Sequence, residues 1–327
     1  MKKLTFIAFA LLCTLLSTIK LKAQAGDDRL KEIADAAIKV KNGWAFGAGF
    51  GLDFAALNLI NPRVGAGQNR LGFGGLGNVF ANYKEDKLYW NSRFSSQLAI
   101  QRIGGKNEPF LKNLDRAIVN SKAGRAINEK WAAAVEAEIE SQLTPTYEGN
   151  FLSKGENRTL IANVFSPAII RLSPGLDYKA TKKLTFFFAP ASIKGIVVMD
   201  DTVAQQGRFI PFKNDDGTFK KSDWQFGGTV KVMYNNKVLN DKMVVSSTLD
   251  LFSNYLRNPQ NIDVQWHNEI GWTIWKGLAL NWVTDVLYDD DIQVQVDRNN
   301  DGIYGTDETG KNTTFISALL LKYNLVF

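Results

Sequence analysis

Residues 297–308, which read DRNNDGIYGTDE, have the residue types and the spacing of a calcium-binding loop. Every specified position of the template D-x-[DN]-x-[DN]-G-x5-E is filled. In such a loop calcium is held by side chains at positions 1, 3, 5 and 12 and by the main-chain carbonyl of position 7. Calcium is therefore the candidate cofactor, and the predicted ligands are Asp297, Asn299, Asp301, the carbonyl of Ile303 and Glu308.

The segments on either side of this loop limit what a bound calcium ion could do. They read DIQVQV and TTFISALLL, which are patterns typical of strands. A calcium sensor changes the angle between two helices, so we expect instead a structural ion that steadies a surface loop. A turn rich in Asp, Asn and Gly without metal remains an alternative. The preceding residues 289–291, all Asp, are either a second cation site or a hydrated acidic rim.

His267 is the only histidine of the chain, and Ser246 lies on the preceding predicted strand with the same parity. A barrel-embedded lipid hydrolase would need such a Ser–His pair together with an oxyanion site. We expect no enzyme and place His267 in a polar network that faces the interior. The other residues expected to face the interior are Glu136, Glu138, Glu140, Lys231, Asp250, Asp263, Glu269 and Asp285.

The segments that must position these side chains share an alternation of apolar and polar residues. In NIDVQWHNEIGWTIW, residues 261–275, nearly every second residue is apolar. Side chains of a strand point to opposite faces in turn, so each such segment has one apolar and one polar face. We predict twelve strands, at about 44–54, 71–83, 87–101, 115–126, 130–143, 167–179, 183–192, 223–235, 242–256, 262–275, 278–296 and 313–327.

The lengths of these strands and of their connections indicate the fold class. Most strands approach the roughly 9 to 11 residues that cross a bilayer at a tilt. Long and short connections alternate along the chain, with 257–261 as the exception, and this asymmetry is typical of outer-membrane barrels. We predict an all-β fold, a transmembrane antiparallel up-and-down β-barrel of about twelve strands. A soluble sandwich or an eight-stranded ligand barrel is the alternative.

The segment NEKWAAAVEAEIESQL, residues 128–143, also carries a helical signal. Ala and Glu are strong helix formers, and Trp131, Val135 and Ile139 recur at helical spacing. The same three residues also share one strand parity, opposite Glu136 and Glu138. We predict a strand, because the segment lies between two other strands of a sheet that must leave no edge exposed to lipid.

The first 25 residues have the three parts of a secretory signal peptide: Lys2 and Lys3, an apolar stretch, and Ala23-Gln24-Ala25. Its removal takes away four lysines and Cys13, so 35 basic and 33 acidic residues remain and the net charge falls from +6 to +2. A nucleic-acid partner is therefore not expected. The predicted division is 1–25 signal peptide, 26–42 periplasmic lead and 43–327 outer-membrane barrel.

The chain ends in FISALLLKYNLVF, in which alternating apolar residues lead to Phe327. This is similar to the C-terminal signal that the barrel-assembly machinery reads in outer-membrane proteins. The expected partners are therefore that machinery and outer-membrane lipid, and the expected location is the cell outer membrane.

Three motifs carry a resemblance to a known family: LDLFSNYLRNPQNIDVQW at 249–266, LYDDDIQV at 287–294 and NVFANYK at 78–84. The chain resembles an uncharacterised family of bacteroidete secreted proteins, a domain of unknown function expected to form outer-membrane β-barrels. The resemblance implies architecture and location, and it transfers no catalytic residue.

Together these observations predict an outer-membrane barrel of unknown substrate. We expect a narrow, porin-like pore, or a barrel whose lumen or external loops bind small polar solutes, with one loop stabilised by calcium. The alternatives are the barrel-embedded lipid hydrolase and a non-conducting structural or adhesive surface protein.

Overall fold

The computed structural model describes residues 42–57, 70–152, 158–275, 278–289, 294–295, 309–310 and 313–326. The predicted signal peptide 1–25, residues 26–41 of the predicted lead, the loop 297–308 and Phe327 lie outside the described residues. Expectations about those segments therefore stay predictions.

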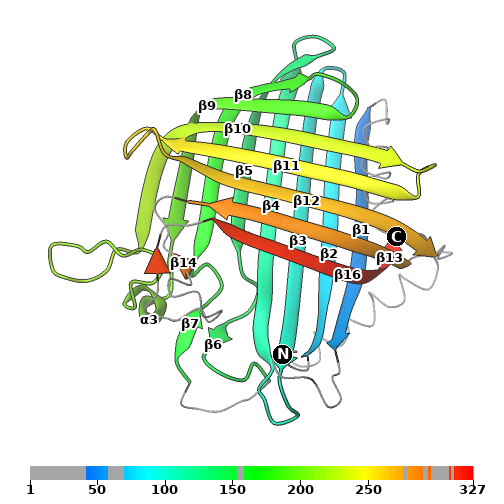
Figure 1. Cartoon of the computed structure of the whole chain (residues 1–327). Coiled ribbons are helices and arrows are strands. Elements are labelled where there is room, and N and C mark those ends of the chain that lie inside the picture. The colour runs from blue at the N-terminus through cyan, green and yellow to red at the C-terminus, as the bar shows by residue number, and fades with distance from the viewer. Residues whose placement is uncertain are drawn as a thin grey trace, which may run out of the picture.

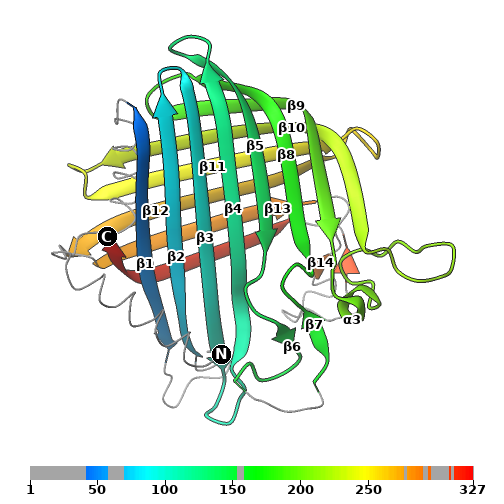
Figure 2. The ribbon, with the colours of Figure 1, turned by 180° about the vertical axis from the view of Figure 1, so that it is seen from behind.

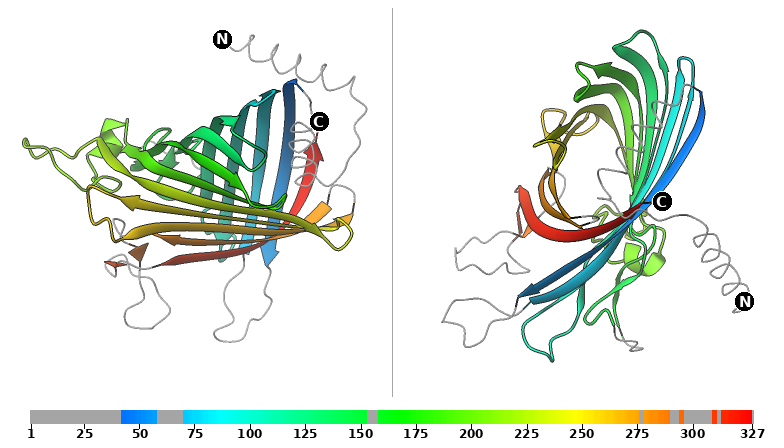
Figure 3. Two further views of the ribbon diagram at one scale, coloured as in Figure 1. Left: turned by 90° about the horizontal axis from the view of Figure 1, so that it is seen from above. Right: turned by 90° about the vertical axis from the view of Figure 1, so that its right-hand side faces the viewer.

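One antiparallel sheet of twelve strands dominates the structure (Figures 1 and 2). Its strands pair in chain order, so that one hairpin follows another. The sheet curls, and β10–β13 lie opposite β2–β5 across an interior (Figure 3). The strands are β1 (Gly43–Leu57), β2 (Arg70–Glu85), β3 (Leu88–Ile103), β4 (Leu111–Ala126), β5 (Trp131–Ser141), β8 (Ala168–Lys179), β9 (Leu184–Val197), β10 (Ser222–Val238), β11 (Met243–Asn254), β12 (Ile262–Trp275), β13 (Leu278–Tyr288) and β16 (Thr314–Val326).

The first and last strands of this sheet also pair with each other. Five registered residue pairs join Gly49–Asp53 of β1 to Lys322–Val326 of β16. By contrast, sixteen registered pairs join β2 to β3. The pairing order thus returns from β16 to β1 along a short stretch only.

Each of the twelve predicted strands has a counterpart among these twelve, and β5 is a strand despite its helix-forming residues. It pairs along most of its length with β4 on one side and β8 on the other. Ladder hydrogen bonds on both sides outweigh the weak intrinsic preference of Ala and Glu for a helix.

The prediction of one continuous strand over 278–296 is wrong. β13 ends at Tyr288, and β14 (Val294–Gln295) belongs to a separate two-stranded sheet with β15 (Thr309–Gly310). Asp289 follows β13 directly and begins a run of three aspartates, a residue type that is depleted in strands. The acidic run therefore ends the strand. The prediction extended the strand past this run because it followed the alternation of apolar residues alone.

The long connections carry small elements of their own and gather at one end of the sheet, while tight turns occupy the other end (Figure 1). β6 (Thr146–Tyr147) pairs with β7 (Leu160–Ala162), and the short helix α3 (Asp201–Ala204) follows β9. No helix within the described residues is long and apolar enough to cross a membrane.

The distribution of side chains over the two faces is the reverse of that in a soluble protein. Large apolar residues are exposed on the outer face, including Phe46, Leu52 and Trp282. Most buried polar residues lie on the inner face of the sheet instead. They include Asn82, Lys122, Glu136, Ser173, Asp177, Lys194, Gln225, Thr229, Lys231, Asp250 and Asn281. A sandwich would bury its apolar parity, so this alternative does not fit the structure.

Candidate functional site

Ion pairs cross the interior of the curled sheet, and Glu136 of β5 lies at their centre. Its Oε1 forms a close ion pair with Nζ of Lys231 on β10, and its Oε2 lies 3.1 Å from Nζ of Lys122 on β4. β8 and β9 separate β5 from β10 in the sheet. The Glu136–Lys231 pair therefore joins two walls that are not neighbours.

On the Lys122 side, the contacts continue to Asp177 of β8. Nζ of Lys122 lies 2.8 Å from Oδ1 of Asp177 and 3.9 Å from the ring centroid of Phe187. The hydroxyl of Tyr89, on β3, donates a hydrogen bond of 2.7 Å to Oδ2 of the same carboxylate. Asp177 is thus held by a cation and a neutral donor that come from different strands.

On the Lys231 side, the contacts continue to Asp250 of β11. Oδ2 of Asp250 lies 3.4 Å from Nζ of Lys231 and 2.6 Å from Nη1 of Arg171 on β8. Because β9 and β10 lie between β8 and β11, this pair also spans the interior. We call seven of the connected residues the interior network: Tyr89, Lys122, Glu136, Arg171, Asp177, Lys231 and Asp250. Glu138, whose Oε2 lies 4.0 Å from Nζ of Lys231, borders this set.

The interior network is balanced in charge and well sheltered from water. It contains three cations and three carboxylates, and Glu136 and Lys231 are only 6% and 7% exposed. A buried charge is tolerated only where it is paired and hydrogen-bonded. Each of the three carboxylates contacts two donor groups. The network therefore narrows the interior with side chains that hold one another.

Three further ion pairs lie nearer to the end with the long connections. Arg116 of β4 binds Glu140 of β5 through two hydrogen bonds of 2.6 and 2.7 Å. Lys194 of β9 lies 3.0 Å from Asp263 of β12 and 3.4 Å from Asp289. The interior therefore stays polar and ionic toward that end.

The wall formed by β1 and β2 is different. The large apolar residues of β1 face outward, so Gly47, Gly49 and Gly51 face inward, opposite Phe80, Asn78 and Leu76 of β2. The inward positions from 45 to 51 and from 72 to 82 contain no charged residue. Over these positions the wall is uncharged, and none of its described residues belongs to the interior network.

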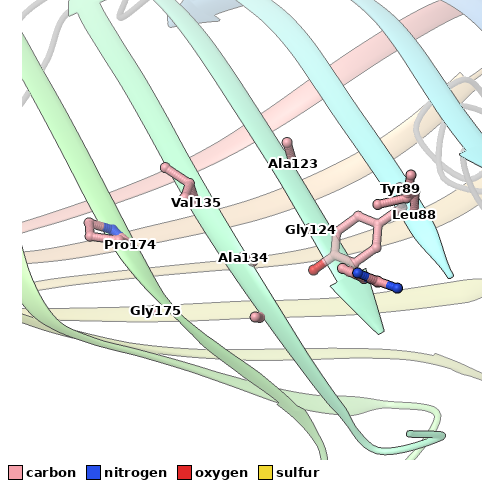
Figure 4. A pocket seen from close by; sticks show the side chains of 10 residues that line it. Leu88, Tyr89, Ala123, Gly124, Ala134, Val135, Pro174 and Gly175 are labelled. Atoms are coloured by element: carbon pink, nitrogen blue, oxygen red, sulfur yellow. The ribbon is translucent and has the colours of Figure 1, made fainter. Parts of the chain in front are cut away.

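A glycine of β4 makes room for the aromatic member of the network. Gly124 is registered opposite Tyr89, and a Cβ atom at Gly124 would lie 2.4 Å from Cζ of the tyrosine ring. Figure 4 shows the ring beside Gly124, in a hollow that small residues of β4, β5 and β8 also line, among them Ala134 and Gly175. The absence of a side chain at 124 lets the Tyr89 hydroxyl reach Asp177.

The residues considered for a hydrolase are not brought together. Nδ1 of His267 lies 2.7 Å from Oδ1 of Asp285, its registered neighbour on β13. The hydroxyl of Ser246 donates to Oδ1 of Asn235 at 2.7 Å. In the register of β11 with β12, His267 lies opposite Thr248 and Ser246 lies opposite Glu269. A nucleophile would need its base within hydrogen-bonding reach.

The predicted calcium ligands Asp297, Asn299, Asp301, Ile303 and Glu308 all lie outside the described residues. Calcium therefore remains a prediction. Within the part of the chain that the structure does describe, no group of three or more His, Cys, Asp or Glu residues is arranged to hold a metal ion.

The residues that we expect to face the interior do face it, and they take part in the contacts described above or in others. Glu138 accepts a hydrogen bond of 3.1 Å from Asn120, and Glu269 accepts one from Asn281. Lys122, Asp177 and Arg171 were not among the predicted residues, although each lies between apolar or small neighbours at the polar parity of its strand. Parity alone could have found them.

Comparison with solved structures finds outer-membrane proteins at low similarity. An outer-membrane channel from Pseudomonas putida F1 is 10% identical over 88% of this chain and 96% of that chain, with a TM-score of 0.42. The translocator domain of the autotransporter NalP from Neisseria meningitidis is 9% identical over 91% and 93%, with a TM-score of 0.39. The monoaromatic hydrocarbon channel TodX is 9% identical over 90% and 91%, with a TM-score of 0.30.

Sequence comparison covers only part of the chain. No curated protein matches. The motif NVFANYK at 78–84 falls within a matched segment, whereas LDLFSNYLRNPQNIDVQW at 249–266 falls outside it, and the bacteroidete lineage is not shown. The matched segment is residues 58–147, which are similar to the family described as protein of unknown function (DUF3078).

Proposed function

We propose that this chain is an outer-membrane β-barrel whose ion-paired interior forms a narrow, non-enzymatic passage for small polar solutes. The observation that carries the proposal is the reversed distribution of side chains: apolar residues exposed on the outer face, charged residues buried on the inner face. Lipid is the solvent that such an outer face requires.

Three further features support the membrane location. The twelve strands have 11 to 17 residues, enough to cross the roughly 25 Å apolar band of an outer-membrane barrel. The long connections and the tight turns lie at opposite ends (Figure 1). The predicted signal peptide suits export.

The passage is narrow because ion pairs between β5 and β10 and between β8 and β11 cross the interior. Paired charges in a confined space favour hydrated, polar solutes over apolar ones. Ser246 and His267 bond to Asn235 and Asp285 and not to each other, which makes the lipid-hydrolase alternative the weaker one.

Planar-bilayer recording of refolded protein lacking residues 1–25 tests the proposal. We expect small conductance steps that become larger in Lys231→Ala, which removes the side chain that crosses from β10 to Glu136. Silence from protein that is inserted and shows heat-dependent gel mobility would contradict the passage and favour a structural or adhesive protein. Protein that stays soluble without such mobility would contradict the barrel itself.

We also propose that calcium steadies the loop 297–308. The support is the complete ligand pattern, from Asp297 to Glu308, between two strands. Limited proteolysis of this loop in refolded protein should be slower with calcium than with a chelator. Glu308→Gln, which removes the bidentate ligand, should abolish the difference. Equal cleavage rates with and without calcium would contradict the site.

A further inference from the structure

An exposed apolar patch lies where β8 begins and β9 ends, at the end of the sheet with the long connections. It consists of Val164, Phe165 and Met199, which are 40%, 44% and 65% exposed. Met199 follows the end of β9, Phe165 precedes the start of β8, and the amide of Met199 donates to the carbonyl of Phe165 at 3.1 Å. We call these three residues the rim patch.

The backbone that presents the rim patch is held from several sides. Phe165 has a φ of 55°, an unusual conformation for an aromatic residue. Asn163 and Ser166 exchange two backbone hydrogen bonds around it, of 2.9 and 2.8 Å. The amide of Phe165 donates to Oγ of Ser141 at 2.8 Å. A residue keeps a strained backbone conformation only where several surrounding contacts hold it in place, and such residues cluster at functional positions.

A second set of bonds ties the same turn to α3. The amide of Asp200 donates to Oγ of Ser166 at 2.8 Å, and Nδ2 of Asn163 donates to Oδ2 of Asp200 at 3.0 Å. Ser166 is fully buried. Val164 and Phe165 therefore lie in a turn whose flanking residues Asn163 and Ser166 form hydrogen bonds with each other and with Asp200.

The interior side of the same segment is already filled. Val198, the neighbour of Met199, is buried in a small core with Val203, Ala204 and Ile210. Because adjacent residues of an extended segment point to opposite sides, Met199 points away from that core. Together with Val164 and Phe165 it forms an exposed apolar patch, and such patches mark interaction sites.

Continuity with the outer face identifies the partner of the rim patch. Leu172 of β8, Ile193 of β9 and Trp224 of β10 are 45%, 43% and 52% exposed. Ile193 and Met199 have the same parity along the segment that leaves β9. Met199 thus continues the apolar outer face of β8–β10 beyond the end of β9, and its backbone bond to Phe165 places the rest of the rim patch beside it.

We infer that the rim patch inserts into the acyl-chain boundary of the outer leaflet and anchors the adjoining segments 158–167 and 198–221 to the lipid surface. The inference rests on the proposed membrane location. It gives these segments a fixed position beside the barrel, with apolar side chains in lipid and the α3 segment on the water side.

A fluorophore scan in lipid vesicles tests this inference. The chain without residues 1–25 has no cysteine, so Phe165→Cys, Leu172→Cys and Asp215→Cys each give one labelling site. Each variant carries an environment-sensitive nitrobenzoxadiazole label and is refolded into phosphatidylcholine vesicles with brominated acyl chains. Leu172 reports the outer face, and Asp215 is an exposed position on the hairpin between β9 and β10.

We expect the label at 165 to be blue-shifted and quenched by the brominated chains about as strongly as the label at 172, while the label at 215 is not quenched. Quenching at 172 without quenching at 165 would overturn the rim inference and leave the barrel standing. Absence of quenching at both positions would overturn the membrane location and the inference with it. A blue shift at 165 that depends on protein concentration, without quenching, would indicate a second copy of the chain instead.

A second variant avoids the strained residue. If Phe165→Cys disturbs the turn, Met199→Cys offers the same measurement at a position with ordinary backbone geometry. Quenching at 199 supports the inference, and its absence in protein that is quenched at 172 contradicts it.

Discussion

Two walls of the same sheet follow one rule of alternation but fill the interior in different ways. The wall of β4, β5 and β8–β11 turns charged residues inward, and they pair across the interior. The wall of β1 and β2 turns glycine and uncharged residues inward from 45 to 51 and from 72 to 82. The outer face is apolar on both walls. Contact with lipid therefore requires apolar residues at the outward positions of both walls. The inward positions can carry either charged residues that pair with one another or small residues that leave space.

The largest effect on stability is expected from removal of Lys231, the cation at the centre of the charged wall. Lys231→Met leaves Glu136 and Asp250 each without one of their cations in a sheltered place, and we expect a loss of about 3–5 kcal/mol in the free energy of unfolding. Urea unfolding of refolded protein, followed by tryptophan fluorescence, measures the loss. Lys237→Met is the matched control, because this lysine lies on the same strand and is exposed.

The double variant Glu136→Gln/Lys231→Met refines that result. Removing both charges of the pair should cost less than removing Lys231 alone, since fewer buried charges stay unpaired. A single variant as stable as the Lys237→Met control would show that the interior network contributes no stability.

Glycines on the two walls offer the next contrast. A methyl group at Gly124 would collide with the ring of Tyr89, so Gly124→Ala should displace the ring from Asp177 and cost about 1–3 kcal/mol. At Gly75 of β2 an added Cβ would meet only ordinary contacts, at 3.8 and 3.9 Å, and Gly75→Ala should be nearly neutral. Thermal or urea unfolding compares the two, and equal effects would contradict the role assigned to Gly124.

The polar cluster around Asp200 lies outside the interior, and its contribution to stability is expected to depend on pH. The hydrogen bond from Asn163, together with those from the amides of Val203 and Thr202, holds the pKa of Asp200 below its usual value. A carboxylate with a depressed pKa stabilises the folded state above its unfolded pKa, and this contribution is lost as pH falls through the folded pKa. The hydrogen-exchange protection factors at α3, which are corrected for the intrinsic pH dependence of amide exchange, should therefore fall in acid.

Asp200→Asn serves as the control for that experiment. Asparagine also caps a helix N-terminus but does not titrate, so the acid-induced loss of protection should be absent in this variant. An unchanged acid response in Asp200→Asn would assign the response to other groups.

The smallest effect is expected at the half-exposed pair of the charged wall. The side chains of Arg116 and Glu140 are 34% and 27% exposed, and water screens such pairs. Arg116→Met should cost no more than about 1 kcal/mol in urea unfolding. A loss as large as that of Lys231→Met would mean that burial does not determine the strength of these pairs.

Much of this arrangement can be predicted from the sequence, because the period of two fixes which face each residue takes. Glu136 and Lys231 are both assigned to the interior on parity alone. Their partnership cannot be predicted that way, since it depends on how far the sheet curls and on which level of β10 meets β5. The same holds for Tyr89 and Gly124, which become neighbours only through the register of β3 with β4.

The short pairing of β1 with β16 has a consequence for the order of assembly. Most other pairings of the large sheet join successive strands, whereas this one joins Gly49 to Val326 across nearly the whole chain. Closing so long a loop costs the most conformational entropy and is repaid by five residue pairs only. We therefore expect it to form last, after the hairpins are in place, with the two terminal strands as the slow step of folding.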